Sequence, residues 1–164
     1  MSIAITSIGV KVSYAFEESK GAGRPTTGYK VLPEVKEIPE MNPTPDTIET
    51  TSFDNKEYKT YVDGLKDLGG ALSFTANFTQ DLYDLYNGTD GITENWETAK
   101  KDGREMYLCI DVPGLSDACF LSVTPSKLGL PSASVNTVME VALYFTPAGE
   151  PVWESKPTYA GVSA

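Results

Sequence analysis

Histidine is absent from all 164 residues of the sequence, and cysteine occurs only twice. Without histidine the chain has no imidazole base, no Ser-His-Asp or Cys-His pair, and no histidine ligand for a metal. Two cysteines cannot supply a four-cysteine zinc site. We therefore expect no cofactor, no metal site and no catalytic residues of these kinds.

The two cysteines, Cys109 and Cys119, flank the stretch IDVPGLSDA, in which the pair Pro113-Gly114 predicts a turn. A hairpin there could bring the two thiols near each other, which leaves a disulfide open. In a reducing cytosol we expect both residues to be small buried hydrophobes instead.

Long apolar runs are also lacking. The N-terminal stretch MSIAITSIGVKVSYAF has no basic segment before its apolar residues, and Lys11 interrupts it well short of a membrane span. Its apolar alternation changes phase between Ile5 and Ile8, which predicts a bulge or an arm. We expect an intracellular product that does not associate with a membrane.

Positive charge is scarce: the chain has 13 Lys and Arg residues but 23 Asp and Glu residues, which gives a net charge of -10. Proteins that wrap nucleic acid neutralise its phosphates with Lys and Arg, so this balance argues against such a role. It permits a surface past which DNA moves without being held, and simple solubility explains it as well. The length and the 40% of hydrophobic residues suit a single domain over residues 1–164.

The remaining patterns predict a mainly β protein. In ALSFTANF, apolar residues alternate with Ser73, Thr75 and Asn77, which is the period of a strand with one wet face. Other strands are expected at 46–53, 108–112, 119–125 and 135–145. The proline-rich stretch 32–46 is expected to be an extended connector.

Two helices are predicted after the strand ALSFTANF. Thr79 can cap QDLYDLYN, which Asn87-Gly88 would end. TENWETAKKDG is the second, with Thr93 as its expected cap and Gly103 closing it. We expect a helix to flank an antiparallel β-sandwich.

Two alternative functions stay open at this point. A carboxylate-based hydrolase would need two facing acids, and Glu49, Asp54, Asp63 and Glu140 are candidates that solvated surfaces explain better. A non-catalytic carbohydrate-binding β-sandwich, or an adaptor protein of a virion, would need an exposed aromatic platform. We expect Trp96 and Trp153 to pack against the core, and we expect no enzyme.

The stretch 37–78, EIPEMNPTPDTIETTSFDNKEYKTYVDGLKDLGGALSFTANF, resembles the core of tail tube proteins (major tail proteins) of long-tailed, non-contractile bacteriophages. A proline-marked connector leads into DTIETTSFD, a charged loop carrying Tyr61 and Gly64 follows, and Gly69-Gly70 open the next strand. The stretch 138–155, VMEVALYFTPAGEPVWES, is similar to a strand and turn near the C-terminus of the same family. The resemblance covers most of the chain from Lys36 to Ser155.

This resemblance implies a fold and a function. The fold would be a two-sheet antiparallel β-sandwich or partial barrel with a flanking α-helix. Copies would form hexameric rings that stack into a tube around a tape-measure protein, with tail tip and tail terminator proteins as further partners. DNA would pass through the tube without specific binding. The protein would belong to the virion tail, and to the host cytoplasm before assembly.

The resemblance also implies two groups of functional residues. An N-terminal arm, about 1–9, and an inter-ring loop, about 54–69, would join neighbouring rings; the loop 16–30 has no counterpart and no assigned role. We expect the channel to be lined by Glu49, Thr51, Ser73, Thr75 and Asn77, with the first two on the strand next to the other three. The residues expected to contact other subunits are Asp54, Lys56, Glu57, Tyr58, Lys59, Tyr61, Asp63, Lys66 and Asp67.

Overall fold

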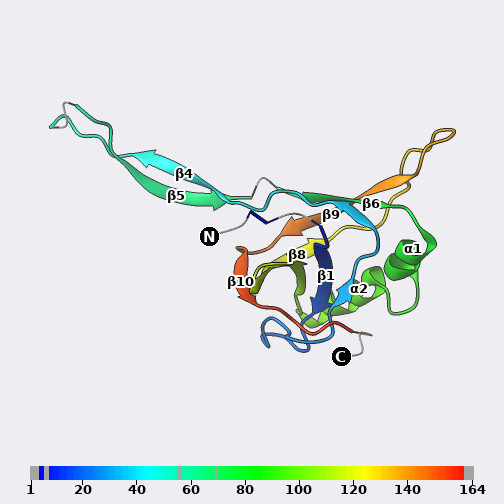
Figure 1. Ribbon diagram of the computed structural model, residues 1–164. Coiled ribbons are helices and arrows are strands. Elements are labelled where there is room, and N and C mark those ends of the chain that lie inside the picture. Colours follow the sequence, from blue (N-terminus) through cyan, green and yellow to red (C-terminus); the bar gives the residue numbers. More distant parts are fainter. Residues whose placement is uncertain (1–3, 6–7, 55–56, 69, 161–164) are drawn as a thin grey trace. The chain divides into compact units, whose positions relative to one another are not determined.

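The computed structural model describes residues 4–5, 8–54, 57–68 and 70–160 (Figure 1). The chain divides into two compact units, which are described separately. Unit 1 comprises the described parts of 1–39 and 71–164, and unit 2 comprises those of 40–70.

Unit 1 contains one eight-stranded antiparallel sheet. Its strand order is β2-β1-β7-β8-β9-β6-β3, and β10 pairs with β8 beside this path. The strands are β1 (Lys11–Phe16), β2 (Lys30–Val31), β3 (Val35–Glu37), β6 (Leu72–Asn77), β7 (Met106–Asp111), β8 (Asp117–Pro125), β9 (Glu140–Pro147) and β10 (Val152–Ser155).

The sheet curls because β8 changes partners along its length. Near its start Phe120 lies opposite Val152 of β10, whereas Val123 lies opposite Pro147 of β9. The two partner strands therefore follow one another along the same edge of β8, and the sheet bends into a partial barrel (Figure 1). Together with a second, two-stranded antiparallel sheet in unit 2, this confirms the mainly β fold class expected from the sequence.

Alternation along β6 and β9 forms the part of the core that the sequence predicts best. Leu72, Phe74 and Ala76 are buried. Phe74 lies directly opposite Leu143 in the register, and its ring meets that of Phe145 edge to face at 5.5 Å between centroids. Such pairs add to the stabilisation that comes from burying the rings. Phe74 and Leu143 are both buried, in agreement with the apolar alternation of the two expected strands.

Both cysteines are free and buried in the same sheet. Cys109 of β7 lies opposite Phe120, and Cys119 of β8 lies opposite Ile110. Burial raises the pKa of the Cys109 thiol to about 11. The expectation of two small buried hydrophobes is therefore confirmed.

The strand expected at 135–145 begins only at Glu140. Val135 and Val138 are exposed, and Asn136 adopts a left-handed backbone with φ 63°. The reason lies in the neighbouring strand: Glu140 pairs with Asn77, the last residue of β6, and the chain then turns into a helix. Residues 126–139 form a long connection that extends beyond the start of β9 (Figure 1).

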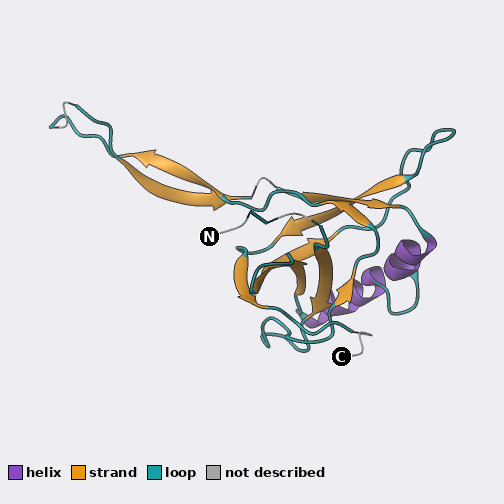
Figure 2. Cartoon of the chain, in the orientation of Figure 1, coloured by secondary structure: helices purple, strands orange, loops and turns teal. Residues whose placement is uncertain are grey.

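Both predicted helices form in unit 1, beside the strands (Figure 2). Helix α1 (Gln80–Asn87) begins as expected, because the Thr79 hydroxyl accepts a hydrogen bond of 3.2 Å from the Leu82 amide. Helix α2 (Ile92–Asp102) is capped by Gly91, so the prediction of Thr93 as its cap is wrong; Thr93 lies in the first turn. No helix in the described residues is long and apolar enough to cross a membrane.

The helix α2 ends at Gly103, as predicted. This residue has φ 72°, a left-handed conformation that glycine adopts without steric cost, and its amide donates back to the helix.

Ile8, the first residue of the second apolar phase near the N-terminus, lies in a turn. Ile8 and Gly9 form this turn just before β1, and Gly9 has φ 81°. Part of the expected N-terminal arm, at 1–3 and 6–7, lies outside the described residues. Its role in assembly stays a prediction.

Unit 2 is a β-hairpin of β4 (Thr44–Glu49) and β5 (Tyr61–Asp67). Two expectations are corrected here. The extended connector ends earlier than predicted, because β4 starts at Thr44 and includes Pro45, which an edge strand tolerates. Residues 61–67, expected within an open loop, form a paired strand.

Candidate assembly surfaces

The hairpin of unit 2 has two chemically different faces. In its register Ile48 lies opposite Val62, while the flanking pairs are Glu49 with Tyr61 and Thr47 with Asp63. Side chains of successive residues point to opposite faces of a sheet. Ile48 and Val62 therefore share one side, here called the apolar face. Thr47, Glu49, Tyr61 and Asp63 share the other, here called the acidic face.

The apolar face is open to solvent. Ile48 is 57% exposed and Val62 50% exposed, and every side chain of β4 is exposed. A two-stranded hairpin without a buried face is only marginally stable in water. Clustered exposed apolar side chains are typical of interaction sites. The hairpin is therefore a candidate surface for binding a partner.

The hairpin tip, residues 51–59, follows the last paired residues. The Thr50 amide donates to the Thr60 carbonyl at 2.8 Å, and the Thr60 amide donates to the Thr51 hydroxyl at 2.9 Å. Beyond this closure, the side chains of Phe53 and Tyr58 stand in solvent, Phe53 completely. The tip thus presents two exposed aromatic side chains.

The structure describes most of the residues expected to contact other subunits. Asp54, Glu57, Tyr58 and Lys59 are exposed on the hairpin tip, and Tyr61 and Asp63 lie on the acidic face of β5. Lys56 lies outside the described residues, and only the backbone positions of Lys66 and Asp67 are described, opposite Pro45 and Thr44. That these residues touch another subunit stays a prediction.

The expected lumen-facing residues of β6 share one face of the sheet in unit 1. Ser73, Thr75 and Asn77 alternate with the buried residues of that strand. Their partners on β9 are Tyr144, Ala142 and Glu140, in that order. The Glu140 carboxylate forms an ion pair with Lys36 of β3, so the pair spans β6. The result is a polar sheet face; that it lines a channel stays a prediction.

The prediction that Glu49 and Thr51 lie on a strand next to β6 is wrong. The partners of β6 are β3 and β9, whereas β4, which carries Glu49, pairs with β5 inside unit 2. Thr51 lies beyond β4 in the hairpin tip. β6 already has a neighbouring strand on each side, and β4 pairs with β5 across the connection 50–60.

The loop 16–30, which had no assigned role, is fastened to unit 1 by a buried carboxylate. Glu17 is 4% exposed, and it accepts hydrogen bonds of 2.8 Å from the amides of Gly23 and Glu105. Arg104 donates to the Glu17 carbonyl at 3.1 Å. A buried carboxylate is stabilised by such donors, so the loop is built into the fold.

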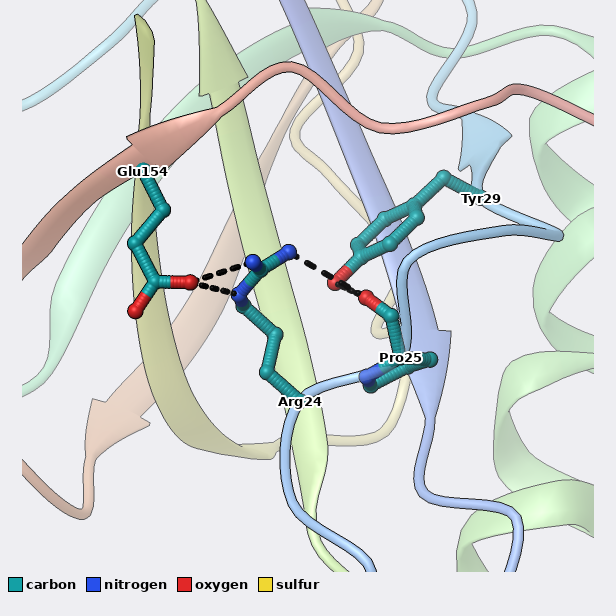
Figure 3. A network of polar contacts seen from close by, with 4 residues as sticks. All are labelled: Arg24, Pro25, Tyr29 and Glu154. Carbon is teal, nitrogen blue, oxygen red and sulfur yellow. Dashed lines mark hydrogen bonds and ion pairs between the residues drawn. The ribbon is translucent and has the colours of Figure 1, made fainter.

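Arg24 ties the same loop to the C-terminal strand (Figure 3). Its guanidinium forms an ion pair with Glu154 of β10 and lies 3.9 Å from the centre of the Phe120 ring. It also donates to the Pro25 carbonyl, which the Tyr29 hydroxyl reaches at 2.9 Å. The Glu154 carboxylate, the Phe120 ring and the Pro25 carbonyl together fix the position of the guanidinium.

Hydrogen bonds and an ion pair join the C-terminal segment 156–160 to this loop and to β7. The Thr158 amide donates to Thr26, and the Ala160 amide donates to Tyr29. Asp111 binds Lys156 at 2.8 Å and Tyr159 at 2.8 Å. Burial alone would raise the pKa of the Asp111 carboxyl, but these two partners outweigh burial and hold the pKa below its usual value. The segment is thus an integral part of unit 1.

No group of three or more Cys, Asp or Glu side chains that could hold a metal ion is found among the described residues. Glu49, Asp54, Asp63 and Glu140 are all exposed, as expected for solvated carboxylates. Trp153 is also exposed, so the prediction that it packs against the core is wrong.

One groove in unit 1 combines apolar and basic side chains. Helix α2 contributes Ile92, Trp96 and Lys100, which follow one another along one helix face, and the end of β8 contributes Pro125 with Lys127 beyond it. Its cavity volume is about 140 Å³. We call it the α2–β8 groove. Sequence reasoning missed it because helix and strand meet only in the folded chain.

Comparison with solved structures identifies the class of fold. The fold is similar to chains of an extracellular contractile injection system and of the anti-feeding prophage. One is in the 6-fold symmetrised baseplate of the anti-feeding prophage, with a TM-score of 0.61 and 11% identity over 94% of this chain and 98% of that one. No protein-family model and no curated protein matches the sequence.

Two further similar chains come from the ends of such assemblies. One belongs to the sheath/tube terminator of the extracellular contractile injection system PVC, in its extended state, with a TM-score of 0.58 and 12% identity over 94% of this chain and 99% of that one. The other belongs to the tube-terminating cap of the anti-feeding prophage, with a TM-score of 0.55 and 13% identity over 94% and 93%. At these identities the likeness concerns the fold.

Proposed function

We propose that this protein is a non-enzymatic structural subunit of a phage tail or tail-like tube, and that copies of it assemble into rings. The observation that carries the proposal is the hairpin of unit 2, whose apolar face is unburied. Such a hairpin gains stability when the apolar face binds another subunit. The likeness in fold to chains of tail-like assemblies supports the same role.

Ring formation also suits the sheet of unit 1. The strands β2 and β3 stand at the two ends of its strand order. Unpaired strand edges are a liability that a neighbouring copy can cover. A repeated head-to-tail contact of this kind closes into a ring when the rotation per subunit divides a full turn. Six copies per ring is the number that the family resemblance implies.

In the proposed ring, Ser73, Thr75 and Asn77 line the channel. This neutral polar surface would let a tape-measure protein or DNA pass without the phosphate contacts that lysines would make. The acidic net charge works in the same direction. The protein would act in the virion tail, after a period in the host cytoplasm, and would meet tail tip and terminator proteins at the ends of the tube.

A second candidate function is a ring at the end of the tube. The likeness to a sheath/tube terminator and to a tube-terminating cap favours it. The two roles differ in polymerisation: a tube subunit stacks on itself repeatedly, whereas a terminator forms one ring and stops. Both roles need the hairpin to bind a neighbour.

The test compares two hairpin variants by electron microscopy and native mass spectrometry. Ile48→Glu places a charge on the apolar face and is expected to abolish rings and tubes, since burying an unpaired charge is costly. Thr47→Glu, the matched control on the acidic face, is expected to assemble like the parent protein. Long tubes of the parent protein support a tube subunit, and single rings support the terminator. A parent protein that stays monomeric at high concentration contradicts both.

A further inference from the structure

Two strands of unit 1 leave an edge open in the part of the chain that the structure describes. There β3 pairs only with β6, and β10 pairs only with β8. The other terminal strand, β2, is only two residues long. At Tyr29, directly before β2, the C-terminal segment occupies the outer edge: the Tyr29 amide donates to the Thr158 carbonyl, and the Ala160 amide donates to the Tyr29 carbonyl. The edges of β3 and β10 are therefore the ones that a further strand can join.

The open edge of β10 carries a large apolar side chain. Trp153 is 56% exposed, and the other side chains of β10 are exposed as well. Tryptophan is enriched among the residues that anchor interfaces. We infer that β10 of one copy pairs with β3 of the next copy around the ring, and that Val35 of β3 covers Trp153. This inference rests on the proposed function and names the strands that close the ring.

The strand directions allow this contact to repeat from copy to copy. β8 is antiparallel to both β9 and β10, β6 is antiparallel to β9, and β3 is antiparallel to β6, so β3 and β10 run in the same direction. Rotation about the channel axis keeps the direction of each strand along that axis, so the two strands meet as a parallel pair. The contact uses different strands on the two copies, which is the heterologous kind that closes into a ring. Main-chain hydrogen bonds of such an added strand supply affinity.

The side chains on the buried face of the sheet agree with this pairing. Trp153 lies opposite Cys119 of β8, and Val35 lies opposite Ala76 of β6. Cys119 and Ala76 are both buried, and the ladder between β8 and β9 joins the buried faces of these strands. Trp153 and Val35 thus belong to the same face. Pairing of β10 with β3 continues this apolar face from one copy into the next.

The charges on the other face also agree. When Val35 stands beside Trp153 in a parallel pair, the residues that follow them, Lys36 and Glu154, stand side by side. Lys36 already forms an ion pair across β6 with the Glu140 carboxylate, and Glu154 forms one with a guanidinium of the loop 16–30. Positive and negative side chains then alternate across the joint. Opposite charges on neighbouring strands stabilise their pairing.

Disulfide trapping tests the pairing of β10 with β3. Neighbouring strands lie about 4.8 Å apart, which is within the range of Cα distances that a disulfide spans. The test protein carries Val35→Cys and Trp153→Cys. It also carries Cys109→Ala and Cys119→Ala, because Cys119 lies opposite position 153 in the same copy. After mild oxidation this protein is expected to give a ladder of covalently joined copies on a non-reducing gel, which a reductant removes.

The matched control moves one cysteine to the other face of β3, with Lys36→Cys in place of Val35→Cys. Its ladder is expected to be at least about tenfold weaker, because side chains of successive residues point to opposite faces. A ladder specific to the Val35→Cys protein supports the inference. A test protein that folds and gives no ladder overturns it.

Fluorescence provides a second measurement that keeps the Trp153 side chain. In a Trp96→Phe protein Trp153 is the only tryptophan, and its emission is expected to shift to shorter wavelength as rings form. Trp153→Ala is expected to raise the concentration needed for rings at least about tenfold, whereas Tyr83→Ala, at an exposed residue of α1, leaves it unchanged. Rings that form without a shift of Trp153 emission overturn the inference and leave the proposed function standing. A parent protein that forms no rings contradicts the proposed function instead, and the ladder then decides whether β10 and β3 pair.

Discussion

At the scale of single residues, alternation is a reliable guide in this chain wherever a neighbouring strand exists. Phe74 is buried as predicted because the residues on both sides of it, Ser73 and Thr75, are polar and turn to the other face. Val135 continues the same pattern as Val141 and is nevertheless exposed. The difference is that Val141 pairs with Ala76, whereas the strand begins only after Val135.

Replacing Phe74 by Ala should lower the free energy of unfolding by about 3–5 kcal/mol. The reason is the cavity left between Leu143 and Phe145, which the rest of the sheet cannot fill. Thermal and urea unfolding measure the change. The matched control, Ser73→Ala on the exposed face, should stay within about 0.5 kcal/mol of the parent. Equal stabilities of the two variants would show that Phe74 does not carry this part of the core.

At the scale of elements, local signals predicted both helices and two of their caps but not the N-terminal cap of α2, and the signal for a loop at 61–67 was wrong. Thr79 and Gly103 cap their helices as predicted, because a cap depends on residues a few positions away. Residues 61–67 carry charges and a glycine that are typical of a loop, yet they pair with β4. Pairing depends on what the partner strand offers, which local composition does not record.

The contact of the C-terminal segment with β7 should depend on pH. The pKa of Asp111 is lowered in the folded protein, so its carboxylate contributes stability above the usual carboxyl pKa of about 3.9. That contribution is lost as the pH falls through the folded value. Hydrogen exchange of residues 152–160 should therefore rise, beyond the intrinsic change, as the pH falls below the usual carboxyl pKa of about 3.9.

A pair of variants isolates the cause of this pH dependence. Asp111→Asn should make the C-terminal segment exchange faster at neutral pH and should remove most of the acid dependence. Glu150→Gln, at an exposed carboxyl group in the turn before β10, should leave the profile unchanged. An Asp111→Asn protein with the parent's acid profile would place the titrating group elsewhere.

At the scale of the whole molecule, the proposed ring places β6 of every copy around the channel. A single lysine introduced on β6 would therefore appear once per subunit and form a ring of lysines. Thr75→Lys should leave folding nearly unchanged, since the residue is partly exposed. Assembled tubes of this variant should retain DNA fragments at low salt and release them as salt rises, because each lysine holds phosphate electrostatically.

The measurement is the amount of labelled DNA that purified tubes retain as a function of salt concentration. Tubes of the Thr75→Ser variant are the control and should retain no more DNA than the parent. Thr75→Lys tubes of normal length that retain none would place β6 away from the channel.

The sequence by itself determined the class of this fold, the N-terminal cap of α1, the end of α2 at Gly103 and the face of β6 that is buried. These features depend on interactions between residues close in the chain, or on a periodicity that any neighbouring strand satisfies. Only the tertiary structure decided that β4 pairs with β5, that β9 starts at Glu140, and that Arg24 fastens the loop 16–30 to β10. It also decided where Trp96 and Lys127 meet. Each of these depends on which distant segment lies alongside, and side-chain pattern alone does not specify that partner.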